Sequence, residues 1–426
     1  MNKSVAYLLI VYGFPPNPGI GGRRWAKYAR VLAEQGNEIH VIAVQPYQRK
    51  ISHWTEDTKH PNIHVHFLKA HYPEVILRGP RSIWEKVKYR RAIARLSREL
   101  KGSIYDKAAY WKEPLTQLAF ELMDRHLIQY VIASAAPFNI PVIASSWKRQ
   151  RPGLVVVSDL RDPWLENKHY GMQGLSEAQR KYEAANEASV VEYSDLFTVP
   201  VEEMAMHYRQ KFPELAKKIS VLPHAYDTRD YHGLKSGKKS TASSLRFVYG
   251  GTLGLVGMEI VMRKLMVELQ QFVHASGFGF EFYTHTPILA SEIEQAGLQN
   301  VIQYRQPVPV NQYLQVLSEA DCCLLFLSEY NKNWMITKFC EFLPLRKPIL
   351  VFAAKGAVSD FVVQNRLGYH FDPASNSWLQ QLGVVKKEAE EGWPSFNREF
   401  DHSSFSAQSV AGQLAEKIQW IADQRK

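Results

Sequence analysis

The sequence has few cysteines and no long apolar run. Three of its 426 residues are cysteine, at positions 322, 323 and 340, in apolar surroundings and without metal-ligand spacing. Their odd number argues against a disulfide framework and a zinc site, and predicts reduced thiols in the core. No stretch approaches the roughly 18 uninterrupted apolar residues of a membrane span.

Export and dinucleotide-binding signals are also missing. The apolar start, Val5 to Tyr12, is short, and Phe14-Pro15-Pro16 follows where a signal peptide would have small residues and a cleavage site. We interpret it as a buried first strand. The glycines at 19–22 do not have the G-x-G-x-x-G spacing, so NAD binding is not supported. No D-x-D-like segment follows a strand, so the predicted site contains no metal.

Acidic residues are fewer than basic residues. The chain has 52 basic and 42 acidic residues, a formal net charge of +10, which favours anionic partners. Eight bases and two acids fall in residues 81–101, where apolar residues follow helical spacing. Such a basic amphipathic helix can lie on an anionic membrane, and the alternative is a packed helix with a solvated basic face. No nucleic-acid-binding motif accompanies the charge, so no nucleic acid partner is predicted.

Short apolar runs alternate with helical stretches along the whole chain, which predicts parallel, doubly wound sheets. The predicted strands are 5–12, 39–44, 63–68, 130–133, 154–157 and 196–199, then 245–249, 278–283, 301–304, 322–327 and 348–352. A polar, small-residue segment at 236–244 separates the two series and is the predicted linker. The predicted domains are therefore 1–235 and 245–403, followed by a helix at 404–426 that can pack on either domain.

Three motifs stand just after predicted strands, where doubly wound domains bind ligands. The first is Gly19-Ile-Gly-Gly22, followed by Arg23 and Arg24 and placed between a strand and a helix. Its small residues let backbone N–H groups approach an anion at the helix N-terminus. A tight turn alone is the alternative explanation of these glycines.

The second motif, Asp159-Leu-Arg161-Asp162-Pro-Trp164, follows the strand at 154–157. Its carboxylates, guanidinium and indole suit contacts with sugar hydroxyls and phosphates. The alternative is an internal Arg–Asp pair that holds the loop, with Trp164 as packing.

The third motif, Thr337-Lys338-Phe-Cys-Glu341, follows the strand at 322–327. Lys338 and Glu341 are three residues apart on a helix, so they share one face. A carboxylate accepts hydrogen bonds from vicinal hydroxyls, and an ammonium neutralises a diphosphate. A surface ion pair without a role is the alternative. Further glycines lie between a strand and a helix at 249–254.

In sequence order, the segments 13–36, 248–254, 320–325 and 338–349 resemble glycosyltransferases of family 4, which have the GT-B fold. The segment 159–164 is similar to a motif of a bacterial polysaccharide-forming branch. The resemblance implies two facing Rossmann-like domains with an interdomain cleft. It also implies a sugar nucleotide, a UDP- or GDP-sugar, held mainly by the second domain and an acceptor held mainly by the first.

Site roles follow from the same resemblance. Glu341 matches the glutamate that contacts the donor ribose, and Lys338 with the backbone at Gly251 and Thr252 would face the diphosphate. Gly21, Gly22 and Arg23 would approach the donor from the other side. Arg161, Asp162 and Trp164 are the acceptor-side candidates, and the predicted catalytic residues are Lys338, Glu341 and Asp162.

Three features depart from the family pattern. The segment 136–141 lacks the histidine of the Pro-Pro-x-x-x-His segment that many relatives have, and two single positions differ. Asn333 stands where relatives have the first of two glutamates, and Thr252 stands where an arginine is expected.

The predicted activity is transfer of a sugar from a nucleoside-diphosphate sugar to an acceptor hydroxyl, with retention at the anomeric carbon. The enzyme would work in the cytoplasm or at the inner face of the cell membrane, on a saccharide or lipid-linked acceptor, in polysaccharide or glycolipid assembly. No tightly bound cofactor is expected. A sugar-nucleotide epimerase of the same fold and a degenerate sugar-nucleotide-binding protein are the alternatives.

Overall fold

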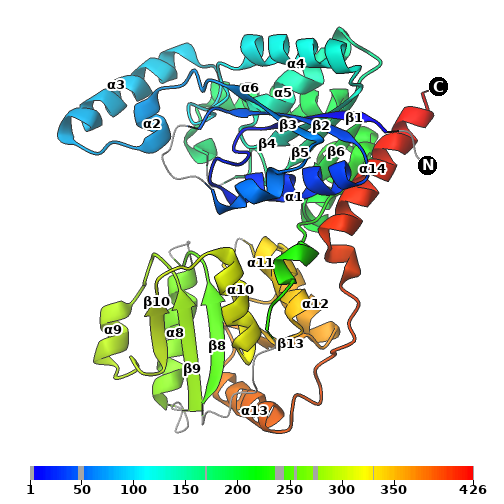
Figure 1. Ribbon diagram of the computed structural model, residues 1–426. Helices are drawn as coiled ribbons and strands as arrows, with labels where there is room; N and C mark the ends of the chain where they lie inside the picture. Colours follow the sequence, from blue (N-terminus) through cyan, green and yellow to red (C-terminus); the bar gives the residue numbers. More distant parts are fainter. Residues whose placement is uncertain are drawn as a thin grey trace. The chain divides into compact units, whose positions relative to one another are not determined.

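The computed structural model describes residues 4–46, 52–167, 170–235, 244–253, 257–271, 277–329 and 331–425. The chain divides into two compact units, one of Met1–Pro223 with Ala407–Lys426 and one of His224–Ser406. Each unit is an α/β domain around one parallel sheet, as the alternating pattern predicts (Figure 1).

The first unit is built on seven parallel strands in the order β3-β2-β1-β4-β5-β6-β7. Its strands are β1 Ala6–Val11, β2 Glu38–Val44, β3 Ile63–Leu68, β4 Tyr130–Ala135, β5 Val155–Leu160, β6 Leu196–Val199 and β7 Ile219–Val221. Its α-helices are α1 Ile20–Glu34, α2 Glu74–Arg78, α3 Ile83–Glu99, α4 Lys112–His126, α5 Asn139–Ser146, α6 Glu177–Tyr193, α7 Glu202–Lys211 and α14 Ala407–Asp423.

The second unit has six parallel strands in the order β10-β9-β8-β11-β12-β13. Its strands are β8 Leu245–Gly250, β9 Phe278–Tyr283, β10 Ile302–Arg305, β11 Cys322–Phe326, β12 Ile349–Phe352 and β13 Gly368–Phe371. Its α-helices are α8 Met258–Gln271, α9 Ala290–Gln295, α10 Val310–Glu319, α11 Thr337–Phe342, α12 Ala357–Gln364 and α13 Trp378–Glu390.

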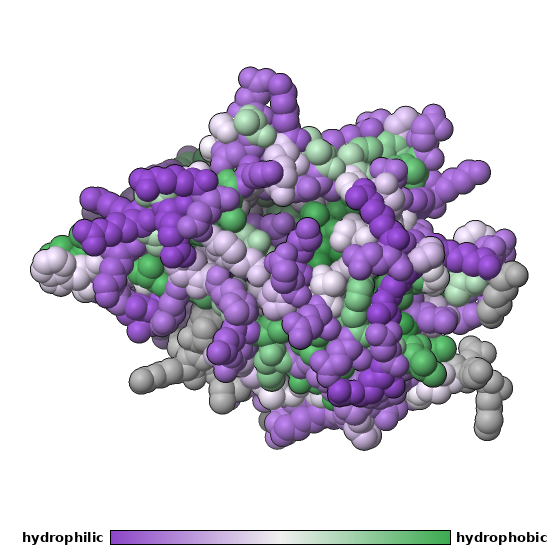
Figure 2. Space-filling model, turned by 90° about the horizontal axis from the view of Figure 1, so that it is seen from above, coloured by the Kyte–Doolittle hydropathy of each residue, from purple (hydrophilic) through white to green (hydrophobic). Residues whose placement is uncertain are grey.

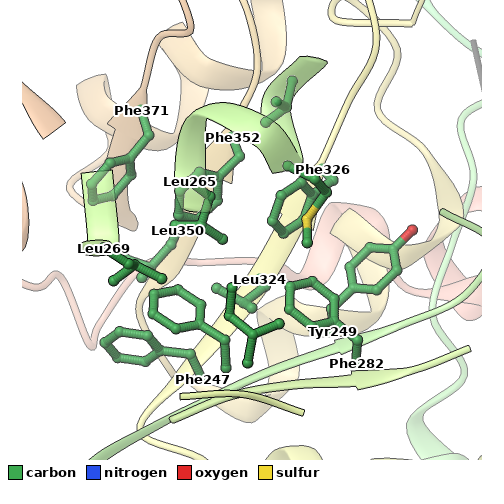
Figure 3. Packing of buried hydrophobic residues seen from close by; sticks show 14 of the residues in the cluster. Phe247, Tyr249, Leu265, Leu269, Phe282, Leu324, Phe326, Leu350, Phe352 and Phe371 are labelled. Carbon is green, nitrogen blue, oxygen red and sulfur yellow. The ribbon is translucent and has the colours of Figure 1, made fainter. Parts of the chain in front are cut away.

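Aromatic side chains of neighbouring strands fill the core of the second unit (Figure 3). Phe326, Phe352 and Phe371 stand on adjacent strands, with ring centroids 4.8 and 4.6 Å apart and nearly parallel rings. Strands β11 and β12 are buried on both faces, as in parallel sheets covered by helices, whereas the edge strand β13 is fully buried only at Phe371. The three cysteines are free and buried, as predicted.

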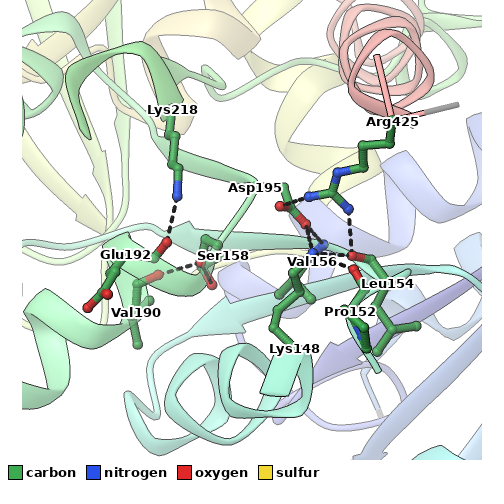
Figure 4. Close-up of polar contacts among 11 residues, drawn as sticks. Lys148, Pro152, Leu154, Val156, Ser158, Val190, Glu192, Asp195, Lys218 and Arg425 are labelled. Carbon is green, nitrogen blue, oxygen red and sulfur yellow. Dashed lines mark hydrogen bonds and ion pairs between the residues drawn. The ribbon is translucent and has the colours of Figure 1, made fainter. Parts of the chain in front are cut away.

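The last helix, α14, belongs to the first unit and packs against α1. Near its end Arg425 bonds the carboxylate of Asp195 and donates to the carbonyl of Leu154 at 2.8 Å (Figure 4). The same carboxylate accepts from the Val156 amide at 2.7 Å and from Lys148 at 3.2 Å. These contacts attach the C-terminal helix to the start of β5.

The unit boundaries differ from the predicted boundaries at 235 and 404. Residues 224–235 pack on the second unit, where the Tyr231 hydroxyl donates to the carbonyl of Glu341 and Tyr226 contacts His402. Residues 236–243 of the predicted linker lie outside the described residues. Within the described part of the chain, no helix is long and apolar enough to cross a membrane.

Candidate functional site

A cavity of about 280 Å³ opens in the first unit at the carboxyl ends of β1 and β4. This is where the strand order reverses, the usual ligand position in doubly wound sheets. The lining residues come from the β1–α1 loop, the β4–α5 loop, residues 103–107 and residues 161–172: Val11, Tyr12, Gly13, Pro18, Gly19, Gly21, Gly22, Ser103, Tyr105, Asp106, Lys107, Ser134, Ala136, Pro137, Phe138, Arg161, Tyr170 and Met172.

Two glycines at the start of α1 are required for different reasons. A Cβ atom on Gly22 would lie 2.0 Å from the carbonyl oxygen of Gly13, so the helix and the β1 loop approach too closely for a side chain. A Cβ atom on Gly21 would lie 1.5 Å from Nη1 of Arg161. Gly21 therefore makes room for a guanidinium, and Gly22 for a backbone.

Arg161 brings a positive charge to the first turn of α1. Its Nε donates to the carbonyl of Ala135 at 3.0 Å, which fixes the side chain against Gly21. The N-cap residue of α1, Gly19, has no side chain to satisfy the first amide groups of the helix. A guanidinium beside a helix N-terminus favours an anionic ligand.

The loop at 103–107 completes the cavity, and no motif in the sequence marked it. Asp106 is buried, and its carboxylate accepts from the amides of Ala108 at 3.0 Å and Asn139 at 2.9 Å. Burial raises its pKa, against the effect of these bonds. Lys107 lines the cavity, and burial lowers its pKa. The loop follows helix α3 instead of a strand, so its position in the sequence does not mark it as a ligand-binding segment.

Asp159, the first residue of the second motif, holds the unit together from a fully buried position. Its carboxylate accepts from Nη1 of Arg24 at 2.8 Å, and also from Trp25, Ser134 and Thr198. Arg24 also donates to the carbonyl of Leu222. This is an internal Arg–Asp pair, although its arginine comes from α1 and not from the motif.

Asp162 and Trp164 differ in exposure. Asp162 is half-buried and accepts from the hydroxyl of Tyr170 at 3.2 Å, beside the cavity. Trp164 is fully buried, stacks on Phe138 at 4.7 Å and donates to Glu183 at 3.0 Å. Trp164 therefore packs against Phe138, a residue of the cavity wall, which agrees with the alternative that Trp164 is a packing residue.

Arg23 is buried with its guanidinium 5.5 Å from the ring centroid of Trp54. It is not among the described residues that line the cavity.

In the second unit, a lysine lies against the glycines that follow β8. A Cβ atom on Gly251 would lie 2.1 Å from Nζ of Lys338, and φ at this glycine is 137°, which side chains rarely allow. Nζ lies 3.5 Å from the hydroxyl of Tyr249 and 4.9 Å from its ring centroid. Burial lowers the pKa of Lys338 to about 8, although the nearby Glu341 acts in the opposite direction.

Glu341 and Thr252 flank this lysine. Glu341 is half-buried on the same helix, α11, and its backbone carbonyl accepts from Tyr231 at 2.6 Å. Thr252 is exposed, and its carbonyl accepts from the Tyr249 hydroxyl at 3.0 Å. The structure therefore brings Lys338, Glu341, Gly251 and Thr252 together at the end of β8.

Tyr313, which belongs to no sequence motif, lies beside this group. A Cβ atom on Gly250 would lie 2.3 Å from its ring, and within the described residues its buried hydroxyl has no hydrogen-bond partner. Its position on α10 is separated in sequence from every glycine motif, so spacing carried no signal.

No protein-family model matches the sequence, and no curated protein matches it. Solved structures do. A glycosyltransferase from Rickettsia africae is 13% identical with a TM-score of 0.64, over 98% of this chain and 99% of that chain. Sucrose-phosphate synthase from Thermosynechococcus elongatus is 12% identical with a TM-score of 0.62, over 98% and 99%. UDP-GlcNAc 2-epimerase from Methanocaldococcus jannaschii is 11% identical with a TM-score of 0.52, over 98% and 100%.

The chain has the GT-B fold.

The cavity residues of the first unit and the residues around Lys338 in the second unit occupy equivalent places in the two halves of the GT-B fold. One follows β1 where the strand order changes from β1 to β4, and the other follows β8 where it changes from β8 to β11. Asn333, which stands at the position of an expected glutamate, makes a structural contact. Its Oδ1 accepts a hydrogen bond from the amide of Ala357 at 2.8 Å and so caps the start of α12.

Proposed function

We propose that this chain is a glycosyltransferase that moves a sugar from a nucleoside-diphosphate sugar to an acceptor hydroxyl. The observation that carries the proposal is the position of Lys338 against Gly251, with Glu341 on the same short helix, at the end of β8. An ammonium and a carboxylate so placed match the diphosphate and the ribose hydroxyls of one donor. The GT-B fold agrees with this but is shared by proteins of other activities.

The donor in this proposal is a UDP- or GDP-sugar, bound as a substrate, with no tightly held cofactor. Lys338 contacts the diphosphate, and the glycine at 251 and the exposed Thr252 let the backbone approach it. Glu341 accepts from the ribose hydroxyls. With a pKa of about 8, Lys338 is mostly protonated at pH 7, and a bound diphosphate would favour its charged form further.

In this proposal the cavity of the first unit binds the acceptor, through its reacting hydroxyl or through a phosphate that it carries. Arg161, an acceptor-side candidate, lies against Gly21, a donor-side candidate, at the N-terminus of α1. The two together form one positively charged part of the cavity wall. Asp162, beside Tyr170, is the nearest half-buried carboxylate of the motif for an acceptor hydroxyl. An acceptor carrying a phosphate, as lipid-linked saccharides do, fits this charge.

In the proposed reaction the bond between the anomeric carbon and the diphosphate oxygen breaks, and a bond to the acceptor oxygen forms. The acceptor proton passes to the departing phosphate, and the anomeric configuration is retained. Positive charge at Lys338 stabilises the leaving diphosphate as its charge develops, which is the main protein contribution in such transfers.

Product analysis tests the activity against its rivals. The protein is incubated with UDP- and GDP-sugars, with and without saccharide or lipid-linked acceptors. Release of nucleoside diphosphate together with a glycosylated acceptor is the expected result. An epimerised sugar nucleotide formed without acceptor would contradict transfer and favour the activity named for the epimerase neighbour. Binding without any turnover would favour a degenerate protein.

We also propose that α3 docks the enzyme on the cytoplasmic face of an anionic membrane, where lipid-linked acceptors for polysaccharide or glycolipid assembly are found. Ile83 and Trp84 at its start are 78% and 79% exposed, and basic residues follow them along the helix. Figure 2 shows a largely hydrophilic surface on this side of the molecule, with pale and green atoms at its left end. Exposed apolar residues beside cations suit a membrane interface.

Vesicle co-sedimentation tests the docking. Vesicles with anionic lipid should bind the protein at moderate salt, and neutral vesicles should bind much less. Trp84→Ala should weaken binding, whereas Trp420→Ala, which removes another exposed indole from α14, should not. Equal loss in both variants, or no binding, would overturn the docking role.

A further inference from the structure

Four histidines and one glutamate gather on one face of the first unit, at an edge of its sheet. Glu38 and His40 stand on β2, His64 and His66 on the neighbouring β3, and His126 at the end of α4. His40 pairs with His64 across the two strands. Alternation along a strand turns Glu38 and His40 to the same face, and likewise His64 and His66.

The carboxylate of Glu38 is the centre of this cluster. Its Oε1 lies 3.0 Å from Nε2 of His40, 3.5 Å from Nε2 of His64 and 3.5 Å from Nδ1 of His126. The ligand atoms of Glu38, His40 and His64 all lie within 4.8 Å of one another. Ligands bound to a tetrahedral ion at about 2.1 Å are separated by roughly 3.4 Å, so only small movements are needed to place an ion among them.

His66 fixes the orientation of the buried ligand. Nδ1 of His40 lies 3.2 Å from Nε2 of His66, and the two rings are nearly parallel. With a hydrogen on Nδ1 directed at His66, Nε2 of His40 carries the lone pair toward Glu38. Metal-bound histidines typically donate their second ring N–H to an acceptor that fixes the ring, and Nε2 of His66 is the acceptor within reach here.

The two histidine ligands differ in their access to solvent. The side chain of His64 is 42% exposed and that of His40 only 2%, so solvent reaches one side of the cluster while the other is anchored.

The cluster is separate from the proposed reaction site. Glu38 is the first residue of β2, whereas the cavity lies at the carboxyl ends of β1 and β4. In a parallel sheet the amino ends and the carboxyl ends of the strands lie on opposite sides, so Glu38 and the cavity are on opposite sides of the sheet. An ion here would join β2, β3 and the end of α4, three segments distant in sequence.

We propose that Glu38, His40 and His64 form a binding site for a divalent transition-metal ion of the zinc type. Two imidazoles and a carboxylate are a ligand set that Zn²⁺ accepts, and soft thiolates are not needed for it. His126, next to the carboxylate and 4.0 Å from the ring of His40, is the nearest side chain for a fourth position. The ion stabilises the edge of the sheet and takes no part in sugar transfer.

Metal titration of tag-free full-length protein, stripped with a chelator and dialysed, tests the site. Zn²⁺ binding is measured by calorimetry, and Co²⁺ is added separately because four-coordinate Co²⁺ gives a distinct visible spectrum. We expect one ion per chain and a rise in melting temperature on Zn²⁺ addition, since ligands of the native state stabilise it.

The variants His64→Gln and Glu38→Gln change partly exposed ligands and should fold, which melting without metal will check. Each should lose at least tenfold in Zn²⁺ affinity. The control His285→Gln removes an exposed histidine of the second unit and should bind like the parent chain. Absence of a stoichiometric site, or equal Zn²⁺ affinity in the parent chain and both ligand variants, would overturn the proposal.

Discussion

Gly21 and Gly22, adjacent at the start of α1, have different neighbours. An alanine at one position should therefore change activity, and an alanine at the other should change stability. Gly21→Ala meets only the end of the flexible Arg161 side chain, which can move, while Gly22→Ala meets the backbone of Gly13. We predict that Gly21→Ala lowers transfer activity at least tenfold with a stability change below about 1 kcal/mol. Gly22→Ala should cost about 1–3 kcal/mol of unfolding free energy. Kinetics and urea unfolding of both variants check this, and the reverse pattern would contradict it.

Lys338 is held at a cost to stability. Its pKa is lowered to about 8 from 10.5, so between these values the unfolded chain binds a proton that the folded chain does not. The free energy of unfolding should therefore rise with pH across this window, and at pH 7 the cost of the buried charge is fully present. We predict that Lys338→Met stabilises the protein at pH 7 by about 1–2 kcal/mol, with a gain that shrinks toward pH 10.

The same variant should lose at least tenfold in affinity for nucleoside diphosphates. Unfolding curves at several pH values and calorimetric titrations measure the two effects. A less stable Lys338→Met at pH 7 would show that the lysine is a structural residue.

At this scale the sequence located the motifs but not their partners. The glycines at 21–22 and 251 and the pair Lys338–Glu341 were found because they lie where a strand is followed by a helix. That Gly21 touches Arg161, or that Asp159 bonds Arg24, depends on packing between segments about 140 residues apart, which spacing does not encode. The roles assigned to these residues in donor and acceptor binding stay predictions.

Among elements, the C-terminal helix depends on one carboxylate. Asp195 joins Arg425 near the end of α14 to Lys148 and to the amide of Val156 (Figure 4). We predict that Asp195→Asn destabilises the protein by about 1–3 kcal/mol, because an amide leaves two cations without their counter-charge. Asp423→Asn changes an acid of the same helix as a control. Chemical unfolding measures both, and equal stabilities would contradict the role of Asp195.

Strand and helix positions were predicted well where apolar residues form a continuous run or a clear periodic pattern. The strands at 63–68, 196–199 and 278–283 match their predicted bounds, and the helix expected within 81–101 is α3. The edge strands β7 and β13 were missed. They contain three and four residues and include polar or glycine positions, so neither presents an apolar run.

For the whole molecule, the alternation of strands and helices predicted two parallel α/β domains, and the resemblance of the motifs to family 4 glycosyltransferases implied the GT-B fold. The limits of the units were harder to predict. The chain returns to its first unit through α14, and residues 224–235 join the second because of contacts such as that of Tyr231 with α11. Such contacts between segments distant in sequence leave no local pattern.

The central claim is a sugar-nucleotide site at the end of β8, and calorimetric titration with a panel of UDP-, GDP- and ADP-sugars tests it most directly. The account predicts tight binding of one nucleotide class, reduced at least tenfold in Glu341→Ala and unchanged in Glu294→Ala, which truncates an exposed glutamate of the same unit. No binding by any donor, or full affinity in Glu341→Ala, would contradict it.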